Sequence, residues 1–96
     1  MNLNNLMQQA QKMQKEYSKK LAEFEAKEFE YDYSNGSVVV KMSGALKIVS
    51  LKINPTLIDP EDPLTLEEMV SEAINNAMEL VSEQKDDLLP KNPGMF

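Results

Sequence analysis

The chain contains no cysteine, histidine or tryptophan, and lysine supplies all ten of its basic residues. Without cysteine or histidine it has no disulfide framework, no zinc or haem ligand set, no thiol nucleophile and no imidazole base. Its apolar runs are short, so the sequence predicts neither a transmembrane span nor a signal-peptide core. We therefore expect a cytoplasmic protein that is not an enzyme and that takes no cofactor and no small-molecule substrate.

Charge is distributed unevenly along the 96 residues, which we expect to form one domain over 1–96. The formal net charge is −6, yet residues 1–20 carry four lysines against one glutamate and residues 37–58 carry three lysines and no acid. The segments 21–36 and 59–96 are acidic. An acidic protein can still hold an anion when its lysines share one face, so the total charge does not exclude a nucleic acid as partner.

Residues 2–26 contain neither glycine nor proline and are rich in good helix formers, which predicts a long first helix. Apolar residues recur on it every seven positions, with further members three positions on, as in the a/d seam of a coiled coil. The seam weakens towards the C-terminal end, where Lys20 and Lys27 take d positions. Its members are Leu3, Leu6, Ala10, Met13, Tyr17 and Phe24.

Three strands are predicted after this helix, at residues 28–33, 38–42 and 46–53. The first alternates aromatic and acidic side chains, which is typical of a half-buried strand. Asn35 and Gly36 tolerate positive φ and predict a tight turn between the first two strands. The apolar residues of the third strand fall on both of its faces, which predicts either a sheet that needs cover on both sides or a β-bulge.

A connection with three prolines leads to a second helix at about 64–86. Thr65 and Glu68 have the spacing of a capping box, and apolar residues then follow at i, i+3, i+4 and i+7. Residues 88–96 contain two prolines and a glycine and predict an irregular tail. The predicted main core comprises Val40, Leu51, Met69, Ile74 and Ala77.

Two groups of lysines are candidate contacts for a polyanion. On the first helix three lysines are spaced i, i+3 and i+7 and form a basic stripe, with a fourth lysine beside them. The alternative interpretation of this stripe is an ordinary solvated helix face. Three more project from the strand region, which has no acidic residue between positions 33 and 58. The acidic stretch 59–68 lacks the residue order and the glycine of a calcium loop, so no metal site is expected. The candidate contacts are Lys12, Lys15, Lys19, Lys20, Lys41, Lys47 and Lys52.

Four stretches stand in a specific order over almost the whole chain: NLNNLMQQAQKMQKE, NGSVVVKMSG, VSLKINPTLIDPEDPLTLEEMVSEAINNA and NPGMF. Together they resemble the bacterial YbaB/EbfC family of nucleoid-associated DNA-binding proteins. The chain departs from the family pattern in a hairpin reduced to Ser34, Asn35 and Gly36, and in its lack of arginine. Lysine supplies point charges but no bidentate phosphate contacts, which bears on affinity and not on the fold.

The resemblance implies an α+β fold, with a helix, a three-stranded antiparallel sheet and a second helix (αβββα). It also implies a tweezer-like homodimer that binds double-stranded DNA with little sequence specificity, associates with the nucleoid and influences nucleoid organisation and gene expression. On this reading the lysines neutralise phosphates and no base edge is contacted. The alternative is a protein–protein interaction module, in which the seam of the first helix or the tail docks on a partner and DNA is not bound directly.

Overall fold

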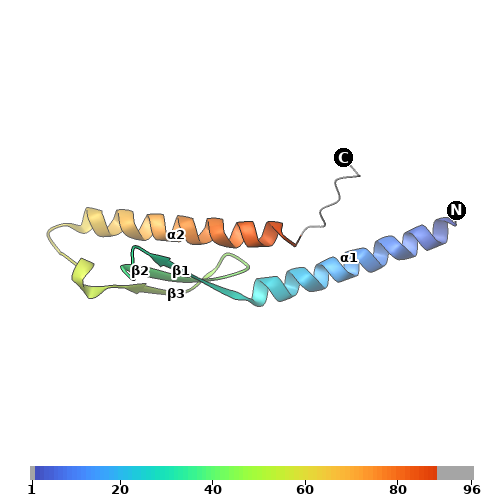
Figure 1. Cartoon of the computed structure of the whole chain (residues 1–96), viewed down its shortest axis with the longest axis horizontal. Helices are drawn as coiled ribbons and strands as arrows, with labels where there is room; N and C mark the ends of the chain where they lie inside the picture. Colours follow the sequence, from blue (N-terminus) through green and yellow to red (C-terminus); the bar gives the residue numbers. More distant parts are fainter. Residues whose placement is uncertain (1, 89–96) are drawn as a thin grey trace.

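A computed structural model describes residues 2–88 of the chain, and Figure 1 shows the arrangement of its elements. They follow the predicted αβββα order: α1 (Leu3–Ala26), β1 (Glu28–Tyr33), β2 (Val38–Ser43), β3 (Ile48–Ile53), a 3-10 helix η1 (Pro55–Leu57) and α2 (Pro63–Asp86). The α+β fold class is therefore confirmed. The predicted tail, apart from Leu88, lies outside the described residues.

The three strands form an antiparallel sheet in the order β1-β2-β3. The register of β2 with β3 shifts between Lys41 and Met42, so that Lys41 pairs with Ser50 and Met42 with Ile48. Val49 is the extra residue of this bulge. Because of it, Ile48 lies on the same face as Leu51 and Ile53, and the bulge is the correct one of the two predicted alternatives.

The strand β3 begins two residues later than predicted. Leu46 has φ 62°, a left-handed conformation that a strand does not accommodate. It belongs instead to the turn after β2, where its N–H donates to the carbonyl oxygen of Ser43 at 2.9 Å. The other turn has positive φ at Ser34, Asn35 and Gly36, as the Asn-Gly pair predicts.

The core lies between one face of the sheet and α2 (Figure 1). The prediction is confirmed for Val40 and Ala77, which are buried, while Met69 and Ile74 are partly buried against the core. It is wrong for Leu51, whose side chain is 38% exposed, because α2 lies over β1 and β2 and leaves β3 largely uncovered. The buried core residues are Phe24, Val38, Val40, Met42, Ala73, Ala77 and Val81.

The second helix starts one residue earlier than predicted, and its N-cap is Asp62 rather than Thr65. The Asp62 carboxylate accepts from the Thr65 N–H at 3.3 Å and from the Thr65 hydroxyl at 2.7 Å. Pro63 takes the first helical position, where its missing N–H costs nothing. The capping-box assignment is therefore wrong, because Asp62 followed by proline offers a better start. Within the described chain, no helix is both long and apolar enough to cross a membrane.

Candidate nucleic-acid interface

Helix α1 projects from the end of the sheet as an arm (Figure 1). Phe24, near its C-terminal end, is the one buried residue of the helix, and residues 2–16 are all exposed. The arm makes the molecule elongated, with extents of 71 × 25 × 18 Å. Any surface that α1 offers is therefore accessible along most of its length.

The joint between arm and body is built around Phe24. Its ring packs on that of Phe29 with centroids 5.2 Å apart, and its carbonyl oxygen accepts from the N–H of Lys27 at 3.0 Å. The turn after β2 closes on the same point, since the Gly44 N–H donates to the Lys27 carbonyl oxygen at 2.9 Å. A Cβ on Gly44 would overlap the Phe24 carbonyl group. Glycine is thus required there for a close backbone approach, a role that the sequence analysis missed.

The arm has a basic side and an apolar side. At about 100° per residue, Lys12, Lys15 and Lys19 fall on one side of the helix, nearly opposite the seam that contains Leu6 and Met13. All three lysines are exposed, as are Leu6 (44%) and Met13 (62%). The structure therefore brings the predicted basic stripe together on a free helix and leaves the opposite apolar side uncovered.

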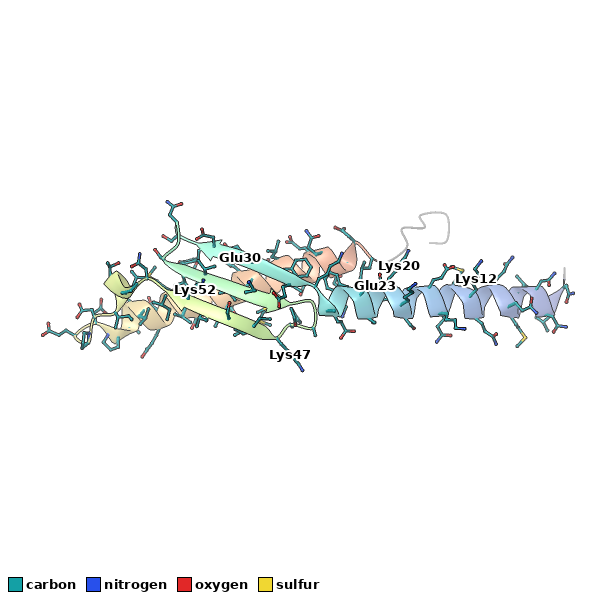
Figure 2. The ribbon with its side chains drawn as sticks, turned by 90° about the horizontal axis from the view of Figure 1, so that it is seen from below. Lys12, Lys20, Glu23, Glu30, Lys47 and Lys52 are labelled. Atoms are coloured by element: carbon teal, nitrogen blue, oxygen red, sulfur yellow. The ribbon has the colours of Figure 1, made fainter. Side chains whose placement is uncertain are left out.

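Lys20 lies beside the stripe, at the root of the arm close to Glu23 (Figure 2). Lys20 is thus near the acidic body, whereas Lys12 stands well out along the arm (Figure 2). The four lysines of the arm thus differ in electrostatic surroundings although they share a helix.

Polar amides extend the basic side towards the N-terminus. Asn5 and Gln8 precede Lys12 by seven and four positions, so they lie on the same side of α1. Together with Gln9, these side chains line a shallow hollow on the helix surface. Amide N–H groups donate to phosphate oxygens and sugars as lysine does, without adding charge. The helical spacing from the lysine stripe was the signal that could have identified them.

The remaining predicted lysines lie apart from the arm. Lys52 and Glu30 are on the sheet face away from α2 (Figure 2). Lys41 pairs with Glu30 in the register of β1 and β2 and lies on the same face, and the three residues line a small hollow. Lys41 Nζ is 4.0 Å from Glu28 Oε1, and the acidic residues of β1 share this face. Lys47 is exposed in the turn that leads into β3. The positive charge of this sheet face is thus offset, and the least opposed group of lysines is the one on α1.

The acidic residues are concentrated elsewhere. Helix α2 carries six acids against one lysine and covers the opposite face of the sheet from Lys41 and Lys52. The arm extends beyond the sheet and α2 (Figure 1). At physiological salt, charges more than about 8 Å apart in solvent are largely screened. The outer lysines of the arm are therefore separated electrostatically from most of the negative charge.

Comparison with known proteins identifies the class to which this fold and this charged arm belong. Residues 1–92 match the model of the YbaB/EbfC DNA-binding family. The chain belongs to that family.

Individual relatives agree with this assignment. The chain is 43% identical over 88 residues to a nucleoid-associated protein of Malacoplasma penetrans, which covers 92% of this chain and 93% of the relative. It is also 43% identical over 96 residues to a nucleoid-associated protein of Streptococcus sanguinis, covering 100% and 93% of the two chains. The crystal structure of an uncharacterized protein from Helicobacter pylori has the same fold, with a TM-score of 0.76, 24% identity and 92% coverage of both chains.

Proposed function

We propose that this protein binds duplex DNA in the bacterial nucleoid, with little sequence specificity and without enzymatic activity. The family assignment supports DNA as the partner. The observation that carries the mechanism is the stripe of Lys12, Lys15 and Lys19 on an arm that is accessible along most of its length. A cytoplasmic location follows from the same proposal, because the nucleoid is there.

Binding runs through phosphate neutralisation. Each lysine that contacts a phosphate releases a condensed counterion, which gives sequence-independent affinity. Lysine ammonium groups, unlike arginine guanidinium groups, form no bidentate fork that would fix a base edge or a phosphate. The neighbouring amides of Asn5 and Gln8 add hydrogen bonds to the backbone of the duplex and carry no sequence information. This arrangement supports low sequence specificity.

The test is a triple variant, Lys12→Gln, Lys15→Gln and Lys19→Gln, because glutamine keeps the helix propensity and removes the charge. In a dimer with two arms on one duplex, six phosphate contacts give a slope of log K against log salt of about −5. The triple variant should bind every duplex sequence more weakly and should flatten this slope. The matched control is Lys41→Gln with Lys52→Gln, which should retain most of the slope.

Electrophoretic mobility of a duplex at two salt concentrations separates the outcomes. Unchanged affinity in the triple variant, with loss in the control, would move the contact site to the sheet face. No shift of the duplex by the parent protein at low salt would refute DNA binding and favour the protein–protein interaction module.

The homodimer is the second part of the proposal. Four residues at and beside the edge strand β3 are exposed: Leu46, Ile48, Val49 and Leu51. We refer to these four, together with Met78 of α2, as the β3 patch.

Met78 belongs to this patch by its position on the helix. Glu72 and Asn76 bond to tyrosines of β1, and helical rotation places Met78, which is 40% exposed, on the other side of α2, towards β3. Exposed apolar side chains gathered at one edge of the sheet support an interaction site there, and a two-fold axis would let the patch cover itself. Sedimentation equilibrium at tens of micromolar should give a mass of at least a dimer, and a monomer would refute this part.

A further inference from the structure

We infer that α1 pairs in antiparallel fashion with α1 of a second copy through its apolar seam. This contact is separate from the β3 patch, because the seam lies on the arm and the patch on the body. The seam is well exposed, with Leu3 at 69%, Leu6 at 44% and Met13 at 62%. A helix without tertiary contacts is marginally stable in water at this length. Covering the seam would therefore stabilise the arm.

An antiparallel pair has a register that fits the side chains. Seam positions a and d face each other when residue i lies level with residue 23 − i of the second copy. Leu6 then faces Tyr17 of the second copy, and Ala10 faces Met13. The small alanine side chain thus meets the long methionine, and the pair covers 3–20, which is the part of α1 that precedes its contact with the body at Phe24.

A parallel pair fits less well. It would place Ala10 against Ala10, which leaves a void, and Lys20 against Lys20, which brings two like charges into one layer. It would also bring both sheet domains to the same end of the pair. In the antiparallel register Lys20 lies level with Leu3 at the open end of the helix pair, and the two bodies stand at opposite ends.

Charges beside the seam allow the antiparallel pair. Glu16 and Gln9 each precede an a position of the seam, and such positions of the two copies lie beside each other in an antiparallel pair. Glu16 therefore lies near Gln9 of the second copy, and two acids do not meet there. The stripe of Lys12, Lys15 and Lys19 points away from the partner helix, because it lies nearly opposite the seam. Pairing therefore leaves the basic side free.

One consequence rests on the DNA binding proposed above. The two helices of a pair turn their seams inwards, so their lysine stripes face outwards in opposite directions. A pair of arms would then hold a duplex on each side and bridge two DNA segments. If the β3 patch also joins two copies, each chain has two different two-fold contacts, which build a chain of copies or a closed ring.

Disulfide trapping tests the pairing and its direction, because the natural chain has no cysteine to interfere. A mixture of Leu6→Cys and Tyr17→Cys chains should form a mixed disulfide on mild oxidation. Leu6→Cys alone should not, since two copies of residue 6 would stand about 16 Å apart along the axis, beyond the reach of a disulfide. No mixed disulfide, or a self-disulfide of Leu6→Cys, would overturn the antiparallel pairing.

The mass in solution, measured without DNA, provides a second test. The parent protein should form assemblies larger than a dimer, and the variant Leu6→Gln with Met13→Gln should form only dimers. The matched control, Lys12→Gln with Lys15→Gln on the opposite side of the helix, should assemble as the parent does. A mass unchanged by the seam variant would overturn the inference. A seam variant that becomes monomeric would support the α1 pair and refute the β3 patch as the dimer contact.

DNA assays keep the two proposals distinguishable. The seam variant should still shift a single duplex in a mobility assay, while losing the ability to pull down a second, labelled duplex with an immobilised one. Pull-down that persists in the seam variant would contradict bridging through α1. Failure of the parent protein to shift any duplex would refute the proposed DNA binding, and the disulfide result would stand independently of it.

Discussion

Val40 and Leu51 are directly paired across β2 and β3 and point to the same side of the sheet, yet one is fully buried and the other is 38% exposed. Replacing each with alanine therefore separates core packing from the contribution of the β3 patch. The two variants report different quantities: Val40→Ala reports on the fold of one chain, and Leu51→Ala reports on the proposed contact between chains.

Val40→Ala removes two methyl groups from a site with no solvent exposure. At about 0.8 kcal/mol for each carbon, with a further contribution from the cavity, the free energy of unfolding should fall by about 2 kcal/mol. In a domain of this size each kcal/mol moves the melting temperature by about 4–8 °C, so a fall of about 8–16 °C is expected. The mass of the assembly should not change.

Leu51→Ala should act mainly on association. If each of the two symmetry-related side chains loses about 1 kcal/mol of apolar contact with the other copy, the dimer dissociation constant should rise by about 30-fold. Because association adds stability by mass action, the melting temperature of this variant should lie below that of the parent at concentrations where the parent is dimeric, and the two should converge in dilute solution. Sedimentation equilibrium and thermal unfolding at two protein concentrations measure both effects. An unchanged dissociation constant for Leu51→Ala would refute the β3 patch as the dimer interface.

Two further predictions concern the body and the joint. The Tyr33 hydroxyl donates a hydrogen bond of 2.6 Å to the Glu72 carboxylate, and this bond raises the pKa of Tyr33 above its ordinary value of 10.0. The hydrogen bond should therefore be present below pH 10 and be lost as the pH rises through the raised pKa. Glu72→Gln should bring the pKa of Tyr33 back towards 10.0 in a spectroscopic titration of the phenolate, and an unchanged titration would contradict this cause. Gly44→Ala should destabilise the fold by about 1–3 kcal/mol, because the new methyl group overlaps the Phe24 carbonyl. Gly36→Ala is the control, because the space around Gly36 is open and only its positive φ would be strained. This variant should lower the free energy of unfolding by about 1 kcal/mol and leave the X-ray scattering profile, which reports the position of the arm, unchanged. An equal loss of stability at both glycines would contradict a special role for the joint.

Periodicity in the sequence predicted the features that depend on neighbours along the chain. It failed to predict the burial of residues that depends on how a further element packs on them. The alternation on β1 correctly gave the two sides of that strand, and Phe24 of the seam is the buried residue of α1. The burial of Leu51 could not be predicted in this way, because α2 crosses only part of the sheet face. The close approach at Gly44 could not be predicted either, since nothing local indicates that the end of α1 packs on it.

The candidate site shows the same division. The spacing of Lys12, Lys15 and Lys19 predicted a shared helix side, and the structure places it on a projecting arm. The strand region, with three lysines and no acid between positions 33 and 58, suggested a second group of lysine contacts. Antiparallel pairing instead brings the acids of β1 beside Lys41, through contacts that are distant in sequence. The sequence therefore predicted the charge of each segment but not which opposite charges would meet.

The elongated shape explains how a chain with a net charge of −6 can present a surface suited to DNA. Lys12 stands about 18 Å along α1 from Phe24 at the joint, and Lys20 only about 6 Å, at 1.5 Å of rise per residue. Since the Debye length is about 8 Å, the acids at the body lower the local potential at Lys20 and scarcely at Lys12. Lys12→Gln should therefore weaken DNA binding more than Lys20→Gln does. The difference should shrink as salt is raised, because screening then removes the influence of the body on both positions. Equal losses at low salt would mean that the duplex lies against the root of the arm as closely as against its outer part, and that distance from the acidic body does not govern the affinity.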